Sequence, residues 1–136
     1  MLVIRRVDPA QALPAFWGLP PRPWHAYCTR RGLLTFTAEQ DGDLTGYAVA
    51  ESHPRAVYVL DLVGDIQICR LLLDRLVRAA GERDVAGWFT MDRPDLGRVL
   101  VRLGFARVAR EDFHGRPSHY YHWHRNRDVW LNQEGR

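Results

Sequence analysis

The sequence predicts a layered α/β domain with a mixed, mostly antiparallel central sheet. A strand–helix–strand unit stands in the middle of the chain, a hairpin precedes it, and a helix with two further strands follows it. Crossovers between strands of one sheet are right-handed, so the two strands of the central unit are expected to be parallel neighbours. We therefore expect a single domain over residues 1–124 and a polar C-terminal tail over 125–136.

The strand–helix–strand unit organises the rest of the chain. A β-favouring run over 57–63 ends at Gly64, and the next residue, Asp65, is of a type that caps helix N-termini. The following helix, from Ile66 to Ala80, is amphipathic, and its apolar side chains recur at three- and four-residue steps: Ile68, Leu72, Leu73, Leu76, Val77 and Ala80. A second strand is expected over 85–91. Because ligands gather where strand ends meet a helix N-terminus, the functional site is expected at 62–67.

The first strand and a hairpin come before this unit. Leu2 to Val7 predicts a short strand. Two β-favouring runs, 34–39 and 44–51, meet at Asp41-Gly42, a dipeptide that suits a tight turn with positive φ. Gly46, early in the second run, indicates a bulge or a close backbone approach.

The segment between the first strand and the hairpin is expected to begin as a helix at Asp8-Pro9 and to be broken by several prolines. Trp24, His25 and Tyr27 follow these prolines. They either line a substrate pocket or pack a loop against the sheet.

A helix and two strands are expected after the central unit. Asp92-Arg93-Pro94 starts the helix, and Gly104 ends it at a position that favours the left-handed conformation. Strands over 105–113 and 118–123 complete the sheet.

Composition excludes several classes of protein. The 46% hydrophobic and 26% charged residues are typical of a globular domain, and no apolar run approaches the roughly 20 residues of a membrane span. The N-terminus does not resemble a signal peptide, and two distant cysteines, Cys28 and Cys69, indicate a cytoplasmic protein. All 19 basic residues are dispersed arginines, so the net charge of +3 predicts no nucleic-acid partner.

The last strand is rich in histidine and aromatic residues. In an extended chain the alternating side chains share a face, which groups Tyr120, His122 and His124 on one side and His119, Tyr121 and Trp123 on the other. A zinc site needs three or four converging ligands, so no metal is expected here. The chain also lacks a nucleophile elbow and a glycine-rich dinucleotide fingerprint.

The order of elements resembles the GNAT N-acetyltransferase superfamily over roughly Val3 to Trp123. The local matches are Ile4-Arg5-Arg6 with Asp8, Gly46-Tyr47-Ala48, Leu72-Leu73 with Leu76 and Ala80, and Leu103-Gly104-Phe105. The short strand-to-helix turn also resembles GNAT-like proteins of Deinococcus and Thermus that have a degenerate cofactor loop. The resemblance implies an acyl-CoA-dependent N-acyltransferase that moves an acetyl group from acetyl-CoA, its cosubstrate, to a small-molecule or peptide amine.

The resemblance also implies where acetyl-CoA lies: in a V-shaped gap between 57–63 and 85–91, held by Leu62, Val63, Gly64, Asp65, Ile66 and Gln67. This sequence departs from the family's Arg/Gln-x-x-Gly-x-Gly/Ala loop, because Asp65, Gln67 and Cys69 replace small residues. A carboxylate beside the phosphate-binding amides is unfavourable by several kcal/mol at roughly 4 Å. The family's tyrosine acid matches Leu100, and its asparagine matches Arg93.

Asp61 and Tyr120 are the candidate catalytic residues. The resemblance implies an acidic base in the strand that holds Asp61, and alternation places Asp61 on one face with Val57, Val59 and Val63. Burial there would raise the pKa of its carboxyl toward that of a general base. The alternative is a cleft-edge aspartate paired with an arginine. Tyr120 is the candidate replacement acid.

Two functions follow. In the first, an N-acyltransferase, Asp61 or a water relay takes the proton of the attacking amine, and the strand backbone near Leu62 and Val63 holds the pantetheine. In the second, the chain is a catalytically inactive GNAT-like domain that binds a ligand or a protein partner, since fold does not fix function. A homodimer is compatible with both.

Overall fold

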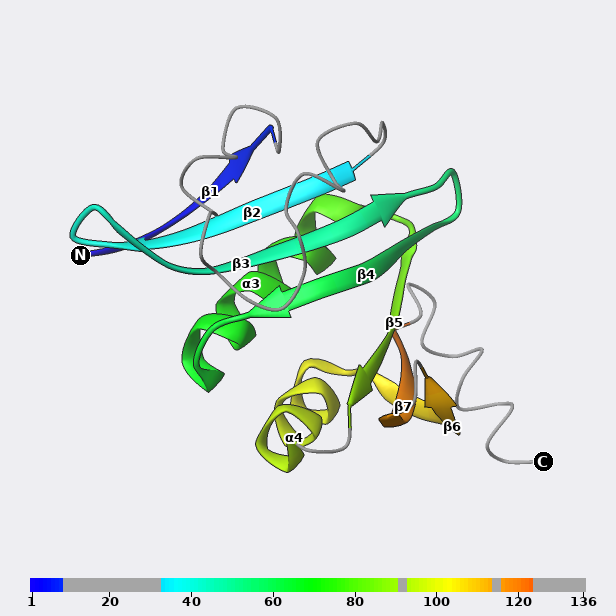
Figure 1. The fold of residues 1–136 in the computed structure, drawn as a ribbon. Helices are drawn as coiled ribbons and strands as arrows, with labels where there is room; N and C mark the ends of the chain where they lie inside the picture. The colour runs from blue at the N-terminus through cyan, green and yellow to red at the C-terminus, as the bar shows by residue number, and fades with distance from the viewer. Residues whose placement is uncertain (9–32, 91–92, 114–115, 124–136) are drawn as a thin grey trace.

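The structure, a computed structural model, describes residues 1–8, 33–90, 93–113 and 116–123 (Figure 1). The predictions for the helix at Asp8-Pro9, for 9–32 and for the tail lie outside these residues, and the division into a domain and a tail stays a prediction. None of the helices among the described residues is both long and apolar enough to cross a membrane.

One mixed sheet forms the centre of the described chain. Its seven strands lie in the order β1-β2-β3-β4-β5-β7-β6, and every neighbouring pair is antiparallel except β4 and β5. The strands are β1 (Leu2–Val7), β2 (Leu33–Gln40), β3 (Asp43–Ser52), β4 (Ala56–Val63), β5 (Asp84–Thr90), β6 (Ala106–Phe113) and β7 (Arg116–Trp123). The predicted α/β class and mixed sheet are confirmed.

The hairpin of β2 and β3 turns at the predicted dipeptide. Asp41 and Gly42 both have positive φ, of 51° and 89°, as a tight turn between twisted strands requires. Gly46 serves both purposes that the sequence indicated. The register slips between Ala38 and Glu39, and a Cβ on Gly46 would lie only 2.4 Å from the carbonyl oxygen of Val63.

The parallel pair β4 and β5 diverges along its length. Pairing runs from Ala56↔Asp84 to Val59↔Gly87 and ends there, although β4 continues to Val63. Figure 1 shows the two strands heading in different directions beyond this point, with β7 and β6 following β5. The strands thus separate as predicted beside the C-terminal half of β4, and the space between their separating ends is called the gap below.

Helices α3 (Ile66–Ala80) and α4 (Pro94–Leu103) pack against each other and cover one face of the sheet. The apolar side of α3 is fully buried at Leu72, Leu73 and Leu76, and burying each such side chain contributes about 2 kcal/mol. They join one core that also includes Phe36, Ala48, Ala50, Val57, Val59, Val85, Phe89, Leu96, Leu100, Phe105 and Tyr121.

Helix α4 begins one residue after Arg93, because Pro94 is suited to the first helical position. Gly104 closes it with φ 104°, and its N–H donates to the carbonyl oxygens of Leu100 and Val101. Phe105, predicted to begin a strand, instead fills the core just before β6. The strand therefore starts one residue later than expected.

Candidate functional site

The candidate site lies where β4 meets α3, and close packing of two glycines shapes it. Gly64 has φ 144°, and a Cβ there would lie 2.6 Å from Cγ2 of Ile68. A Cβ on Gly46 of β3 would lie 2.7 Å from the same methyl group. The side chain of Ile68, from the first turn of α3, thus fills the space that both glycines leave, and this packing fixes the helix start against the strand ends.

Asp65 caps α3 as predicted. Its Oδ1 accepts a hydrogen bond of 2.9 Å from the backbone N–H of Ile68, the third helical residue. The carboxylate is exposed and occupies the place where a helix N-terminus attracts an anion. Asp65 therefore supplies an anion from the chain itself.

The other predicted cofactor-binding residues take different roles around this cap. The side chains of Leu62 and Ile66 are partly buried and pack against the core. Gln67 is exposed on the first turn of α3, and Val63 ends β4 opposite Tyr47 of β3. Because the pairing with β5 stops at Val59, the backbone of β4 beyond it faces the gap instead of β5.

Arg93 is the residue at this site that the sequence analysis missed. Its Nη1 donates to the carbonyl oxygen of Gly64 at 3.3 Å and lies 3.8 Å from Sγ of Cys69. Its Nε lies 3.9 Å from Oδ1 of Asp95, and about a third of the side chain is exposed. The guanidinium of Arg93, at the N-terminus of α4, thus reaches across the gap to Gly64, the residue that precedes the Asp65 cap.

Cys69 lies beneath this arginine and is fully buried. Its thiol donates to the carbonyl oxygen of Gly64 at 3.3 Å. Burial raises the pKa of the Cys69 thiol, and the nearby Arg93 guanidinium partly opposes that rise. The thiol is therefore held protonated, in keeping with its place in the packed core.

Asp61 lies on a different face from the one that alternation predicted. The register of β3 and β4 runs from Ala50↔Val59 directly to Val49↔Asp61, so Leu60 is an extra residue in a β-bulge. The bulge reverses the alternation. Asp61, half-buried, shares the face of Val49, Tyr47 and Val63, whereas Val57 and Val59 point into the α3 core. The prediction of a common face was wrong for these two valines and right for Val63.

The face that carries Asp61 also holds buried polar groups. Thr35 and Thr37 of β2 pair with Val49 and Tyr47, so their side chains point the same way. Both threonines are almost fully buried, and their hydroxyl groups have no hydrogen-bond partner among the described residues.

Tyr120 lies on this same face. It pairs with Trp88 across β5 and β7, with ring centroids 5.1 Å apart. Burial is the main cause that raises the pKa of the Tyr120 hydroxyl, with Tyr58 and Asp84 adding to it. His122, two residues further along, lies 3.1 Å from Oδ2 of Asp84. The structure thus brings both predicted catalytic residues to one face of the sheet, opposite α3.

The remaining site predictions have separate outcomes. Trp24, His25 and Tyr27 lie outside the described residues. His119 and Tyr121 share the α4 face, as alternation predicted, since Tyr121 packs edge-on against Phe89. Within the described ranges no three histidine, cysteine or acidic side chains are grouped to hold a metal ion.

Comparison with known proteins bears on the fold. The sequence matches no protein-family model and no curated protein sequence. Among solved structures, the ribosomal-protein-S18-alanine N-acetyltransferase of Escherichia coli matches with a TM-score of 0.76 and 15% identity, covering 90% of this chain and 93% of its own. A protein from Desulfovibrio desulfuricans that is classed in the GNAT family matches with a TM-score of 0.65 and 17% identity, over 92% and 99%. This chain has the GNAT fold.

A third structure of this fold carries the cosubstrate. Arabidopsis thaliana NAA60, solved in complex with acetyl-CoA, matches with a TM-score of 0.67 and 14% identity, over 90% of this chain and 98% of its own. At such identities the likeness concerns the fold, and the chemistry of this chain has to be argued from its own residues.

Proposed function

We propose that this chain is an N-acyltransferase that transfers an acetyl group from acetyl-CoA to an amine. The observation that carries the proposal is the end of β4–β5 pairing at Val59↔Gly87, so that β4 continues unpaired with β5 to Val63, just before the capped N-terminus of α3. Beyond it the edge of β4 offers backbone groups to an extended amide-containing chain, and pantetheine is such a chain. The GNAT fold supports the proposal at the level of architecture.

The charges at the junction bear on whether acetyl-CoA fits. Asp65 occupies the anion position of the helix, which opposes a diphosphate there. Arg93 brings a cation to the adjacent Gly64, and a guanidinium binds phosphate oxygens strongly. We infer that Arg93 takes over part of the phosphate binding that a glycine-rich loop provides through its amides. Acetyl-CoA, when bound, supplies an activated thioester.

The acceptor amine is proposed to approach from the face that carries Asp61. There the Asp61 carboxylate, directly or through a water, takes the proton that the amine loses as its nitrogen attacks the thioester carbon. Tyr120 would return a proton to the leaving thiolate, in keeping with the direction in which its pKa is raised. Trp24, His25 and Tyr27 remain proposed contacts for the acceptor.

Binding of acetyl-CoA is the first test. Thermal-shift titrations with acetyl-CoA, with coenzyme A and with a phosphate-free pantetheine analogue would each raise the melting temperature with concentration if the ligand binds the native state. Release of free coenzyme A in the presence of a panel of peptide and small-molecule amines would then measure transfer. Absence of any shift at millimolar acetyl-CoA would refute the proposal.

A second candidate function is a binding module without catalysis, and one observation favours it. Leu100, at the position of the family's tyrosine acid, is fully buried in the core with α3 and cannot donate a proton. Together with the Asp65 cap, this is compatible with a GNAT-like domain that retains only ligand or partner binding. Ligand binding without coenzyme A release would favour this second function.

A further inference from the structure

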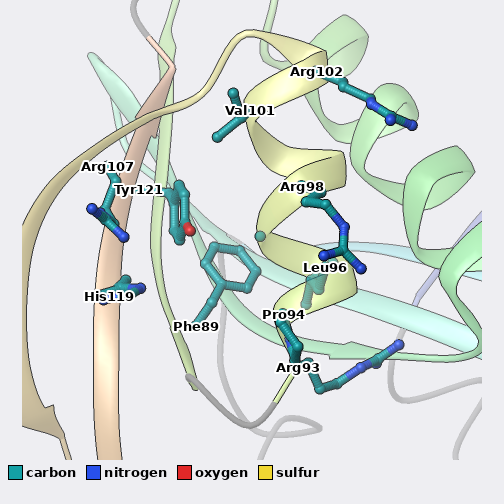
Figure 2. Close-up of a pocket in the computed structure, with 11 residues that line it drawn as sticks. Phe89, Arg93, Pro94, Leu96, Arg98, Val101, Arg102, Arg107, His119 and Tyr121 are labelled. Carbon is teal, nitrogen blue, oxygen red and sulfur yellow. The ribbon is translucent and has the colours of Figure 1, made fainter.

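A cleft lies on the α4 side of the sheet, next to the β4–α3 junction, which it meets at Arg93. It has a volume of about 530 Å³ and opens between α4 and the strands β5, β6 and β7 (Figure 2). This volume falls within the range of about 300–1,000 Å³ that is usual for small-molecule sites. Its lining residues are Phe89, Arg93, Pro94, Leu96, Gly97, Arg98, Val101, Arg102, Arg107, His119 and Tyr121, and none of them comes from β4 or α3.

The floor of the cleft is apolar and aromatic, and Gly97 lets the hydroxyl group of Tyr121 approach α4 closely. Phe89 and Tyr121 pack edge-on with ring centroids 5.9 Å apart. A Cβ on Gly97 would lie 3.0 Å from the hydroxyl oxygen of Tyr121, so a side chain there would crowd the tyrosine. Glycine is a poor residue for a helix interior, and this close approach gives a physical reason for it. Val101, one turn further on, leaves 59% of its surface exposed at the rim.

The rim of the cleft is positively charged. Four of the lining residues are arginines and none is acidic. The guanidinium of Arg93 is directed to Gly64 and Asp95, whereas Arg98, Arg102 and Arg107 have no ion-pair partner among the described residues. In Figure 2, Arg107 and His119 extend from the strands beside the aromatic floor, whereas Arg98 and Arg102 leave α4 on the side away from the strands, so Arg107 is the arginine beside the floor.

His119 reports this positive potential. Burial and the charges of Arg107 and Arg110 lower the pKa of its imidazole below the ordinary value. Arg107 and Arg110 point to the same side of the sheet as His119, because they pair with Tyr121 and His119 across β6 and β7. Asp112, near the far end of β6, is on that side as well. The guanidinium groups of Arg107 and Arg110 thus create a positive potential near His119, and a bound anion would offset it.

We propose that this cleft binds a small aromatic anion, with its ring against Phe89 and Tyr121 and its anionic oxygen atoms at the guanidinium of Arg107. Aromatic walls favour a planar apolar body, and guanidinium groups favour carboxylate or phosphate oxygens with paired hydrogen bonds. Arg93 borders both this cleft and the junction proposed for acetyl-CoA, but the aromatic floor and Arg107 belong to the cleft alone, so the proposal does not depend on the acyltransferase function.

Phenyl phosphate is the probe for a first test, read from the His119 imidazole by NMR with the resonance assigned through His119→Gln. Saturable binding is expected to raise the pKa of His119, because the bound anion offsets the arginines. Benzyl alcohol, which has the ring without the charge, should leave this pKa unchanged. Inorganic phosphate should need a higher concentration. The proposal would be overturned if phenyl phosphate caused no saturable shift of the His119 pKa. It would also be overturned if phenyl phosphate and inorganic phosphate had equal effects, because that would indicate a nonspecific anion effect.

Calorimetry on three variants locates the site. Arg107→Gln should weaken phenyl phosphate binding about tenfold, the loss expected for one charge-assisted hydrogen bond. Gly97→Leu should weaken it by filling the cleft without a change of charge. Arg55→Gln, on the exposed β3–β4 turn, is the charge-matched control and should keep the wild-type affinity. Equal losses for Arg55→Gln and Arg107→Gln, or full affinity in both cleft variants, would refute the placement.

Discussion

Replacing Asp65 separates the stability of α3 from the binding of acetyl-CoA. The structure gives this residue one capping hydrogen bond, of 2.9 Å, to the Ile68 amide. Loss of such a cap in Asp65→Ala should lower the free energy of unfolding by about 1 kcal/mol. For a domain of this size, that corresponds to a fall in melting temperature of about 3–4 °C. Asp65→Gly should cost only a few tenths of a kcal/mol, since glycine is accepted at this position.

The effect on the ligand has the opposite sign. The carboxylate is exposed, so its repulsion of a phosphate is set by a high dielectric and amounts to about 1 kcal/mol at a separation of a few ångströms. Asp65→Gly should therefore bind coenzyme A about fivefold more tightly than the wild type. The gain should shrink at high salt, because an exposed pair is screened.

Isothermal calorimetry and thermal unfolding of wild type, Asp65→Ala and Asp65→Gly measure both effects. Asp74→Ala is the matched control: it removes the same charge from α3 together with the 3.1 Å ion pair to Arg78, and it leaves the cap intact. It should leave the affinity for coenzyme A unchanged. If the wild type binds tightly and Asp65→Gly loses binding, Asp65 supports the ligand and the repulsion argument is wrong. If neither binds at millimolar ligand, the acyltransferase proposal fails.

Three further predictions test the neighbouring residues. Gly46→Ala should destabilise the fold by more than about 2 kcal/mol in denaturant unfolding, because the new Cβ would lie 2.4 Å from a backbone oxygen. The control is Gly42→Ala, whose new Cβ meets open space, so that only the strain of the positive φ remains. Since the folded state raises the pKa of the Cys69 thiol, the free energy of unfolding should fall as the pH rises above the ordinary thiol range. Arg93→Gln should slow alkylation of Cys69 further, because the guanidinium that lowers this pKa is lost. Faster alkylation in this variant would contradict the assigned cause. If transfer activity is found, Asp61→Asn should reduce kcat/KM about a hundredfold or more with the melting temperature nearly kept, and an unchanged rate would remove Asp61 from the mechanism.

Local chemistry accounts for what the sequence predicted well. The Asp41-Gly42 turn, the Asp65 cap and the Gly104 terminus each depend on the conformational preference of one or two residues, and all three are confirmed. The parallel placement of β4 and β5 follows from a chirality rule that needs only the order of elements. Such features are readable because the residues that cause them lie next to one another in the chain.

The face of Asp61 could not be read in this way. Alternation holds only while each residue of a strand has one partner, and a single extra residue reverses every side chain beyond it. The extra residue here is Leu60, an ordinary β-favouring side chain in the middle of the run. In β3, Gly46 signals the nearby bulge, but neither Leu60 nor its neighbours in β4 are glycines. Only the pairing with β3 reveals the reversal, and pairing is a long-range property.

Arg93 was hidden for a related reason. In the sequence it is a departure from the family's asparagine, 29 positions away from the carbonyl group that it contacts. Its role depends on the divergence of β4 and β5, because the gap places the start of α4 within reach of Gly64.

The contact changes how the missing glycine-rich loop is interpreted. A loop of bare amides neutralises phosphate with partial charges on the backbone, and Asp65 here consumes one of those amides. Arg93 adds a full positive charge at the adjoining residue, so the charge of the junction is balanced by one anion and one cation from the chain itself. In the proposed acyltransferase, such a site would bind a phosphate through a flexible guanidinium instead of a fixed backbone, and its affinity would depend on whether Arg93 contacts the phosphate or the carbonyl oxygen of Gly64. Loss of the glycines therefore weakens the argument for acetyl-CoA less than the sequence alone indicates.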